Sequence, residues 1–438
     1  MILFTAGGIC TQCFSSWQAM VHKDTLHNNL TVITERMPYV RSVAFGLWIK
    51  VGSMHEKEDQ NGMAHFIEHM LFKGTQKRDT LQIAREVDTI GGQMDAFTSR
   101  EYICLNLHVL DEHFERALEI MADMVLHPRF HKDDLIKERG VILEEIKMVQ
   151  DTPDELAQDL FVSSLWKGHP LGRPIAGIRR TVQKINQKAL IAFFRRHFRA
   201  GNMIFTAAGN LHHEKVLSLA DKYLGALKKG NSRNTETLPR CNRRMVLKNN
   251  RKLQQLNICL GIPAYGQNHR DRYACHLLNA ILGGTMSSRL LQKIREELGL
   301  AYSIFSFVVS HKNSGFLLVH AGTGKKTGNQ VIDLIAAEMT KFKNAPVSLE
   351  ELNLVKDFVK GVIFLGLEST PGRMAYLAKQ EMYHGSYQTP DSLRKHIDAV
   401  TREDVLRVST DLFSSDFLNL IVVGDLSYFR KPASISLG

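Results

Sequence analysis

The chain has 438 residues, of which 44% are hydrophobic and 23% are charged. This balance is typical of a globular protein, and the length exceeds what one core supports, so we expect two or three domains. The net charge is +11, but the basic residues are dispersed apart from a patch between Arg240 and Lys252. We therefore expect no nucleic-acid partner. No apolar run approaches the length of a bilayer crossing, and we expect no membrane association.

The six cysteines form no recognisable framework. Cys10 and Cys13 make a single C-x-x-C without a second pair, so a zinc-ribbon or redox interpretation is weak. The first twenty residues are mildly apolar and the first lysine is Lys23, which lacks the basic start of a secretory signal. Free thiols suit a reducing compartment, and we predict a cytoplasmic protein, with a periplasmic or organellar location as the alternative.

Strands rich in β-branched and aromatic residues alternate with amphipathic helices along the first half of the chain. In chain order the predicted elements are strands 30–35 and 42–51, helices 62–73 and 80–90, strands 93–99 and 101–110, helices 111–126, 133–150, 154–165 and 186–198, strand 203–208, and a helix to about 224. A polar, basic segment with Gly and Pro follows at 228–244 and is the natural linker.

The second half repeats this organisation. Helix 401–413, strand 419–423 and Gly424 correspond to helix 186–198, strand 203–208 and Gly209, an offset of 424 − 209 = 215 residues. The same offset carries His65 to Ala280 and Glu145 to Lys360. We therefore predict two copies of one α/β domain. The alternative is that the two halves share this order of helix, strand and glycine by chance.

The helix predicted at 62–73 carries polar groups that are unusual for its surroundings. His65 and His69 are four residues apart and share one face, with Glu68 beside them. Asn61 is a candidate N-cap, and Gly74 marks the end. The other positions are apolar: Met63, Ala64, Phe66, Ile67, Met70, Leu71 and Phe72. Burying two imidazoles and a carboxylate is costly unless they are paired or bind a metal. The alternative is a pair of core histidines satisfied by hydrogen bonds.

The helix predicted at 133–150 offers a further ligand. Glu145 is surrounded along the helix by Val141, Ile142, Met148 and Val149, whereas Glu144 neighbours Gly140 and Lys147. We therefore assign the buried role to Glu145 and not to Glu144. The alternative for Glu145 is a carboxylate paired with a nearby Lys or Arg.

A catalytic zinc needs three protein ligands and one open position. His65, His69 and Glu145 can supply them, which implies one Zn²⁺ per chain. Glu68 then faces the open position as the general base for a zinc-bound water. The sequence therefore predicts hydrolysis of a peptide bond.

His65-x-x-Glu68-His69 and Glu145 resemble the zinc site of the inverzincins, the pitrilysin and mitochondrial-processing-peptidase family of zinc metalloendopeptidases, and in particular its half-size bacterial members. The resemblance spans about residues 25–425. The family's third ligand is a glutamate about 75 residues past the second histidine, and Glu145 follows His69 by 145 − 69 = 76 residues. A family glutamate seven residues earlier corresponds to Glu138, as a helper of the site.

The resemblance also implies substrate contacts. Ala96, Phe97 and Thr98 correspond to an edge strand that pairs with the substrate backbone, although Asp95 stands where the family usually has Asn. Arg295 and Tyr302 correspond to a pair that holds the substrate carbonyl and the developing oxyanion.

The fold implied is of the α/β (α+β) class, with two homologous domains, each a mainly antiparallel sheet covered by helices on one face. The expected divisions are an N-terminal extension 1–24, a catalytic zinc-binding domain 25–227, a linker 228–244, a homologous domain 245–430 that contributes Arg295 and Tyr302, and a tail 431–438. Half-size members pair around a chamber, and a chain that carries both motifs is expected to form a homodimer.

The sequence thus predicts a zinc metalloendopeptidase that hydrolyses oligopeptides or unfolded segments in an enclosed chamber. Two alternatives remain open at this point. One is a non-catalytic peptide-binding or assembly subunit, and the other is a peptidase dedicated to processing a precursor.

Overall fold

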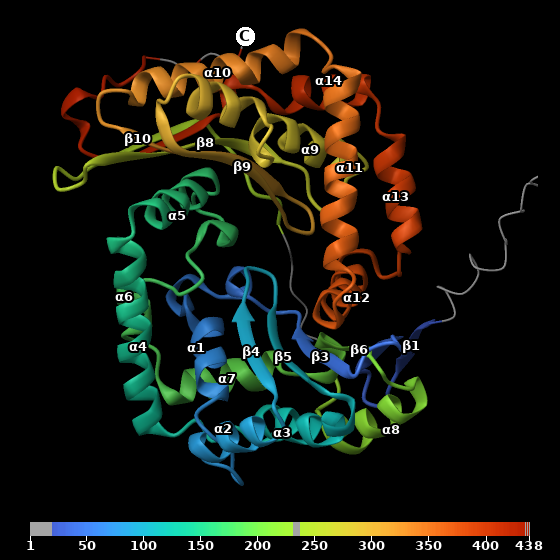
Figure 1. Cartoon of the computed structure of the whole chain (residues 1–438). Coiled ribbons are helices and arrows are strands. Elements are labelled where there is room, and N and C mark those ends of the chain that lie inside the picture. Colours follow the sequence, from blue (N-terminus) through green and yellow to red (C-terminus); the bar gives the residue numbers. More distant parts are fainter. Residues whose placement is uncertain (1–19, 231–236, 434, 436, 438) are drawn as a thin grey trace, which may run out of the picture.

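The computed structural model describes residues 20–230, 237–433, 435 and 437. Cys10, Cys13, most of the predicted extension and the middle of the predicted linker lie outside this described part. The chain forms two mainly antiparallel sheets with helices packed on them, which confirms the predicted fold class (Figure 1). None of the described helices combines the length and the low polarity that a bilayer crossing requires.

The first sheet has six strands in the order β1-β2-β6-β3-β5-β4. Only β2 and β6 run parallel. The strands are β1 (Val21–Thr25), β2 (Thr31–Arg36), β3 (Ser42–Ile49), β4 (Gln93–Thr98), β5 (Ile103–Leu110) and β6 (Met203–Gly209). Strand β1 was not predicted, and its pairing with β2 places residues 21–24 in the sheet and not in an extension.

The second sheet has five strands in the order β7-β11-β8-β10-β9. They are β7 (Arg244–Asn249), β8 (Gln255–Ala264), β9 (Ala301–Ser310), β10 (Gly315–Gly324) and β11 (Asn419–Gly424). Read strand for strand, this is the order β2-β6-β3-β5-β4 of the first sheet, again with one parallel pair at the same place. The two sheets are therefore copies of one topology.

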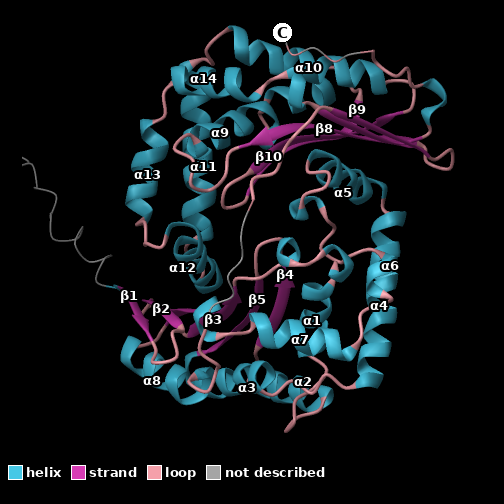
Figure 2. Ribbon diagram, turned by 180° about the vertical axis from the view of Figure 1, so that it is seen from behind, coloured by secondary structure: helices cyan, strands magenta, loops and turns pink. Residues whose placement is uncertain are grey.

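Most helices recur in the same chain order in both halves, although two helices of the first half have no α-helical counterpart in the described second half. Figure 2 shows the helices of both halves. In the first half they are α1 (Met63–Leu71), α2 (Thr80–Thr89), α3 (Phe114–Leu126), α4 (Lys132–Asp151), α5 (Pro153–Leu165), α6 (Arg179–Val182), α7 (Gln187–His197) and α8 (His213–Leu224). In the second half they are α9 (Arg272–Asn279), α10 (Gly328–Asn344), α11 (Leu349–Gly366), α12 (Thr370–His384), α13 (Pro390–Ala399) and α14 (Arg402–Leu412).

Two helices in equivalent positions are exchanged between the halves. Helix α5 packs on β8 and β11 of the second sheet, and α12 packs on β3 and β6 of the first (Figures 1 and 2). Phe161 on α5 and the adjoining Trp166 are fully buried against Phe316 of β10, with ring centroids 5.4 and 5.6 Å away. Burying aromatic side chains of this size contributes about 2–3 kcal/mol each, so the exchange fixes the two halves to one another.

Candidate metal centre

Gly62 is the residue before helix α1, and its φ of 97° favours glycine. The prediction that Asn61 caps this helix was wrong. The carboxylate of Glu56 takes that role, accepting hydrogen bonds from the N–H of Gly62 (2.8 Å) and of Ala64 (2.7 Å). The Asn61 amide also donates to Glu56, at 3.0 Å, and is thereby occupied. Burial raises the pKa of Glu56 to about 8, against the lowering effect of these donors.

Glu56 is therefore a positioning residue that sequence reasoning missed. It lies before the motif in a polar segment, and nothing in that segment distinguishes it from the other acids.

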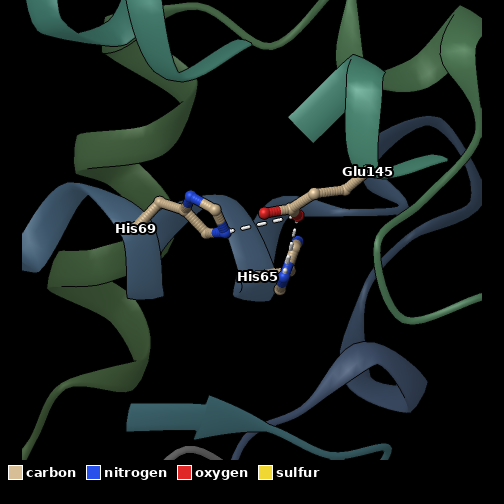
Figure 3. A group of neighbouring side chains, drawn as sticks. All are labelled: His65, His69 and Glu145. Atoms are coloured by element: carbon tan, nitrogen blue, oxygen red, sulfur yellow. Dashed lines mark ion pairs between the residues drawn. The ribbon is translucent and has the colours of Figure 1, made fainter. Parts of the chain in front are cut away.

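His65, His69 and Glu145 converge at one point (Figure 3). Glu145 Oε2 lies 3.7 Å from His65 Nε2 and 3.6 Å from His69 Nε2, and the three ligand atoms all lie within 4.8 Å of one another. A tetrahedral zinc with bonds of about 2.0–2.2 Å separates its ligand atoms by about 3.3–3.6 Å. The three side chains therefore fit a zinc ion with little movement.

The charge state of the imidazoles also suits a metal. Burial, with a smaller contribution from His69, lowers the pKa of His65 to about 4, so this ring is neutral at physiological pH. Neutral imidazole is the form that binds metal ions. Glu144, the neighbour that we rejected as a ligand, is 77% exposed and lies 3.5 Å from Lys147, whereas Glu145 is 36% exposed.

Glu138 lies behind His69 and does not face the ligand cluster. Its Oε2 is 3.1 Å from His69 Nδ1, and its Oε1 pairs with Lys73 at 2.8 Å. This buried carboxylate fixes the imidazole tautomer so that Nε2 offers its lone pair toward Glu145. Glu138 is therefore placed to orient a ligand, about two turns along α4 from Glu145.

Glu68 projects from α1 into a cavity of about 710 Å³ that His65 and Glu145 also line. Thr98 Oγ1 donates a hydrogen bond to Glu68 Oε2 at 2.5 Å, which leaves Oε1 without a partner among the described side chains. Burial raises the pKa of Glu68, and the hydrogen bond from Thr98 opposes this rise. Thr98, which we expected at the substrate, thus also holds Glu68.

Among the described strands, β4 is the last of the first sheet and pairs with β5 alone. Ala96 lies within it, and Phe97, which is partly exposed, lines the same cavity as Glu68. The strand therefore has a free edge beside the cavity.

Arg295 and Tyr302 lie in the second half, on the helical turn Leu291–Glu297 and at the start of β9. Tyr302 is 79% exposed, and Arg295 Nε lies 3.5 Å from Glu296. Neither residue is among those that line the metal cavity. The structure does not bring this pair to the zinc ligands, and its role remains a prediction.

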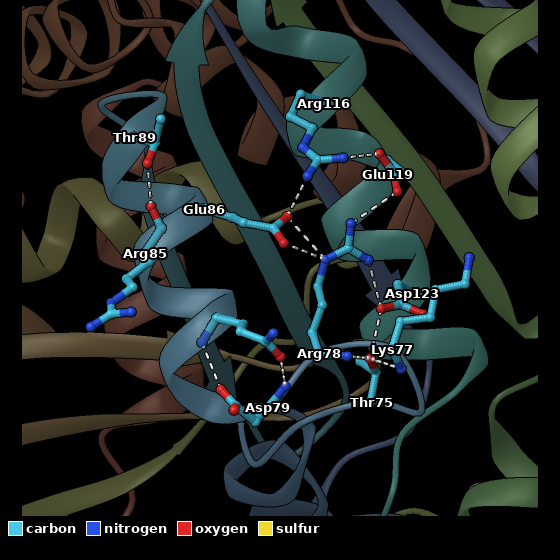
Figure 4. Close-up of polar contacts among 11 residues, drawn as sticks. Thr75, Lys77, Arg78, Asp79, Arg85, Glu86, Thr89, Arg116, Glu119 and Asp123 are labelled. Atoms are coloured by element: carbon cyan, nitrogen blue, oxygen red, sulfur yellow. Dashed lines mark hydrogen bonds and ion pairs between the residues drawn. The ribbon is translucent and has the colours of Figure 1, made fainter.

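The chain that leaves α1 is anchored by a cluster around Arg78 (Figure 4). The buried Arg78 guanidinium pairs with Asp123 at 2.7 Å, with Glu119 at 2.9 Å and with Glu86 at 3.0 Å. Thr75 Oγ1 donates to the same Asp123 carboxylate. This network ties the segment after α1 to α2 and α3.

Comparison with known proteins finds two family models along the chain. The insulinase (peptidase family M16) model matches residues 31–179, which contain all three ligand residues, and the peptidase M16 inactive domain model matches residues 184–358. The chain is 36% identical to an uncharacterized zinc protease of Bacillus subtilis, over 91% of this chain and 97% of that protein. It is 35% identical to one of Streptomyces coelicolor, over 93% and 90%.

Two solved structures share the fold. A peptidase M16 inactive domain from Pseudomonas fluorescens superposes with a TM-score of 0.88 at 20% identity, over 94% of this chain and 100% of that one. A protease from Helicobacter pylori gives a TM-score of 0.84 at 21% identity, over 92% and 99%.

Proposed function

The chain belongs to the M16 family of peptidases, and from this premise we propose that it is a zinc-dependent endopeptidase that cleaves oligopeptides or unfolded segments. The observation that carries the proposal is the convergence of His65, His69 and Glu145 beside a carboxylate, Glu68, that is not needed as a ligand.

Each side chain has a distinct task. Zinc, when bound, lowers the pKa of a water molecule and polarises the carbonyl to be attacked. Glu68 accepts a proton from water at Oε1, because Thr98 occupies Oε2, and returns it to the leaving amine. Glu138 keeps the His69 ring in the orientation that binding requires.

The free edge of β4 supports a peptide bound as an added strand. Backbone hydrogen bonds along an edge give broad sequence tolerance, which suits varied or unfolded substrates. A contact of Arg295 and Tyr302 with the substrate carbonyl is carried over from the family resemblance, and because neither residue lines this cavity it would require the two halves to move closer together. A homodimer that encloses a chamber is part of the same proposal.

The decisive experiment is cleavage of a quenched fluorescent peptide by the Glu68→Gln protein. We expect the unmodified protein to cleave the peptide and a chelator to stop it. Glu68→Gln should lower the rate by about 100-fold or more while zinc stays bound, because general-base catalysis contributes about 10²–10⁴-fold.

Glu144→Gln, a change on the exposed side of α4, is the matched control and should leave the rate unchanged. Full cleavage by Glu68→Gln contradicts the role of Glu68. Peptide binding without cleavage by the zinc-loaded, unmodified protein would favour the non-catalytic alternative.

A further inference from the structure

A second cavity, of about 370 Å³, lies in the second half between α9, α11, α12 and α13. Its place in the topology is that of the metal cavity in the first half. Helix α9 connects β8 to β9 as α1 connects β3 to β4, and α11 follows α10 as α4 follows α3. None of the three zinc ligands lines this second cavity, so any ligand that it binds must be recognised by other side chains.

This cavity has one permanent cation, Arg272, among its described lining residues, because burial lowers the pKa of both histidines there. Arg272, His276 and His384 line it, and no Asp or Glu is among the described residues that do. Arg272 donates to the Tyr273 hydroxyl at 2.7 Å and lies over that ring, 4.3 Å from its centroid. No acidic side chain in the described part of the chain pairs with Arg272, because the adjacent Asp271 is already held by Arg407, at 2.6 Å.

The rest of the cavity is apolar. Its walls are formed by Leu277, Phe358, Val359, Val362, Ile363, Leu393 and Ile397. Phe358 and Val362 are 44% and 58% exposed and form an accessible side. The volume is at the small end of the range of about 300–1,000 Å³ for ligand sites, which suits a ligand the size of one or two amino-acid residues.

We propose that this cavity binds the carboxylate of an apolar amino acid, either a free amino acid or the C-terminal residue of a peptide. The carboxylate pairs with Arg272, and the apolar side chain packs on Phe358 and Val362. A guanidinium that pairs with no described acid and an apolar wall complement these two parts of one ligand. The site is separate from the zinc ligands.

Titration calorimetry on the full chain tests this with three probes. L-Leucine represents the free amino acid, N-acetyl-L-leucine represents a peptide C-terminus, and N-acetyl-L-leucinamide lacks the carboxylate. We expect one or both acids to bind, and the pattern identifies the source of the ligand. The amide should bind at least about tenfold more weakly, because a charge-assisted bond is lost.

Arg272→Gln should weaken binding of the acids about tenfold to hundredfold. The matched control is Arg270→Gln, two residues away, exposed and outside the cavity, which should leave binding unchanged. Val362→Trp fills the accessible side from a surface position and should abolish binding even if Arg272→Gln folds poorly.

His65→Gln should leave this binding unaltered, which separates it from any carboxylate held by zinc. The proposal is overturned if neither acid binds at about 10 mM, which is above the range of about 1 μM–1 mM typical of substrates. It is also overturned if the amide binds as well as the acids, or if Arg272→Gln and Val362→Trp both bind as the unmodified protein does. Because the readout is equilibrium binding, a failure here does not bear on the peptidase proposal, and a failure of Glu68→Gln does not bear on this one.

Discussion

The two halves of the chain share a scaffold and differ in chemistry. Gly46 on β3 and Gly261 on β8 are separated by 261 − 46 = 215 residues, the offset of the repeat. A Cβ at Gly46 would lie 2.9 Å from Met374 of α12, and one at Gly261 would lie 2.6 Å from Phe161 of α5. Both halves therefore keep a glycine where the exchanged helix approaches the sheet, although only the first half keeps the zinc ligands.

The exchange gives the second half a part in the metal site. Helix α4 carries Glu145, and α5 follows it after a single residue, Thr152. Because α5 is packed on the second sheet, the end of α4 is held by both halves. A domain without ligands of its own thus helps to position one of the three.

The largest effect is expected where α12 meets the first sheet. Arg373 pairs with Glu35 at 3.0 Å, and both side chains are buried. Arg373→Met leaves the carboxylate without its partner and should lower the free energy of unfolding by about 3–5 kcal/mol in urea denaturation. Burial raises the pKa of Glu35 and Arg373 opposes this, so without Arg373 the carboxyl binds a proton more readily in the folded state. The loss should therefore be smaller at pH 5 than at pH 8, and an equal loss would contradict the account.

The paired glycines give a sharper comparison. Gly261→Ala places a methyl group against an aromatic ring and also 2.6 Å from the carbonyl oxygen of Leu317, neither of which can move freely. We expect a loss of about 1–3 kcal/mol. Gly46→Ala meets the flexible end of Met374 and should cost less. A larger loss at Gly46 would show that the two exchanged helices are not held in the same way.

Removal of the carboxylate behind His69 tests the orientation of the ligands. Glu138→Gln should weaken zinc binding about 10–100-fold, measured by competition with a chelator, because the imidazole loses its ionic partner. Glu144→Gln, on the exposed side of the same helix, is the control. An unchanged zinc affinity in Glu138→Gln would show that His69 is oriented by packing alone.

The smallest effect concerns the stability of the folded state at low pH. Glu101, after β4, accepts hydrogen bonds from His311 (3.2 Å), from the Lys312 N–H (2.8 Å) and from the Tyr383 hydroxyl of α12 (2.8 Å). Burial alone would raise the pKa of Glu101, but these partners together lower it below its usual value. The folded state therefore gains stability above about pH 4.5 that is lost as the pH falls through the lowered pKa. Glu101→Gln should reduce the fall in the free energy of unfolding at acid pH. An unchanged fall would show that other carboxylates cause it.

The sequence predicted what depends on local periodicity. His65, Glu68 and His69 share a face because of helix geometry, and the apolar neighbours of Glu145 distinguished it from Glu144. The repeated helix–strand pattern predicted the second half, where α14 and β11 match α7 and β6.

What depends on distant contacts was not predictable. An apolar face on a helix such as α5 indicates burial but not which sheet it packs on, so the exchange left no sign in the sequence. Asn61 is a residue type that often caps helices, but in the structure the free N–H groups donate to the carboxylate of Glu56. The spacing of Arg295 and Tyr302 in the sequence also did not show where this pair lies relative to the zinc ligands.

Zinc content tests the central claim most directly. Elemental analysis of the purified chain should find one zinc per chain, and Glu145→Gln should lose it. Lys360→Gln, at the equivalent position 360 − 215 = 145 of the repeat, should retain it. A chain that binds no zinc, or a Glu145→Gln protein that holds as much as the unmodified one, would contradict a site built from His65, His69 and Glu145.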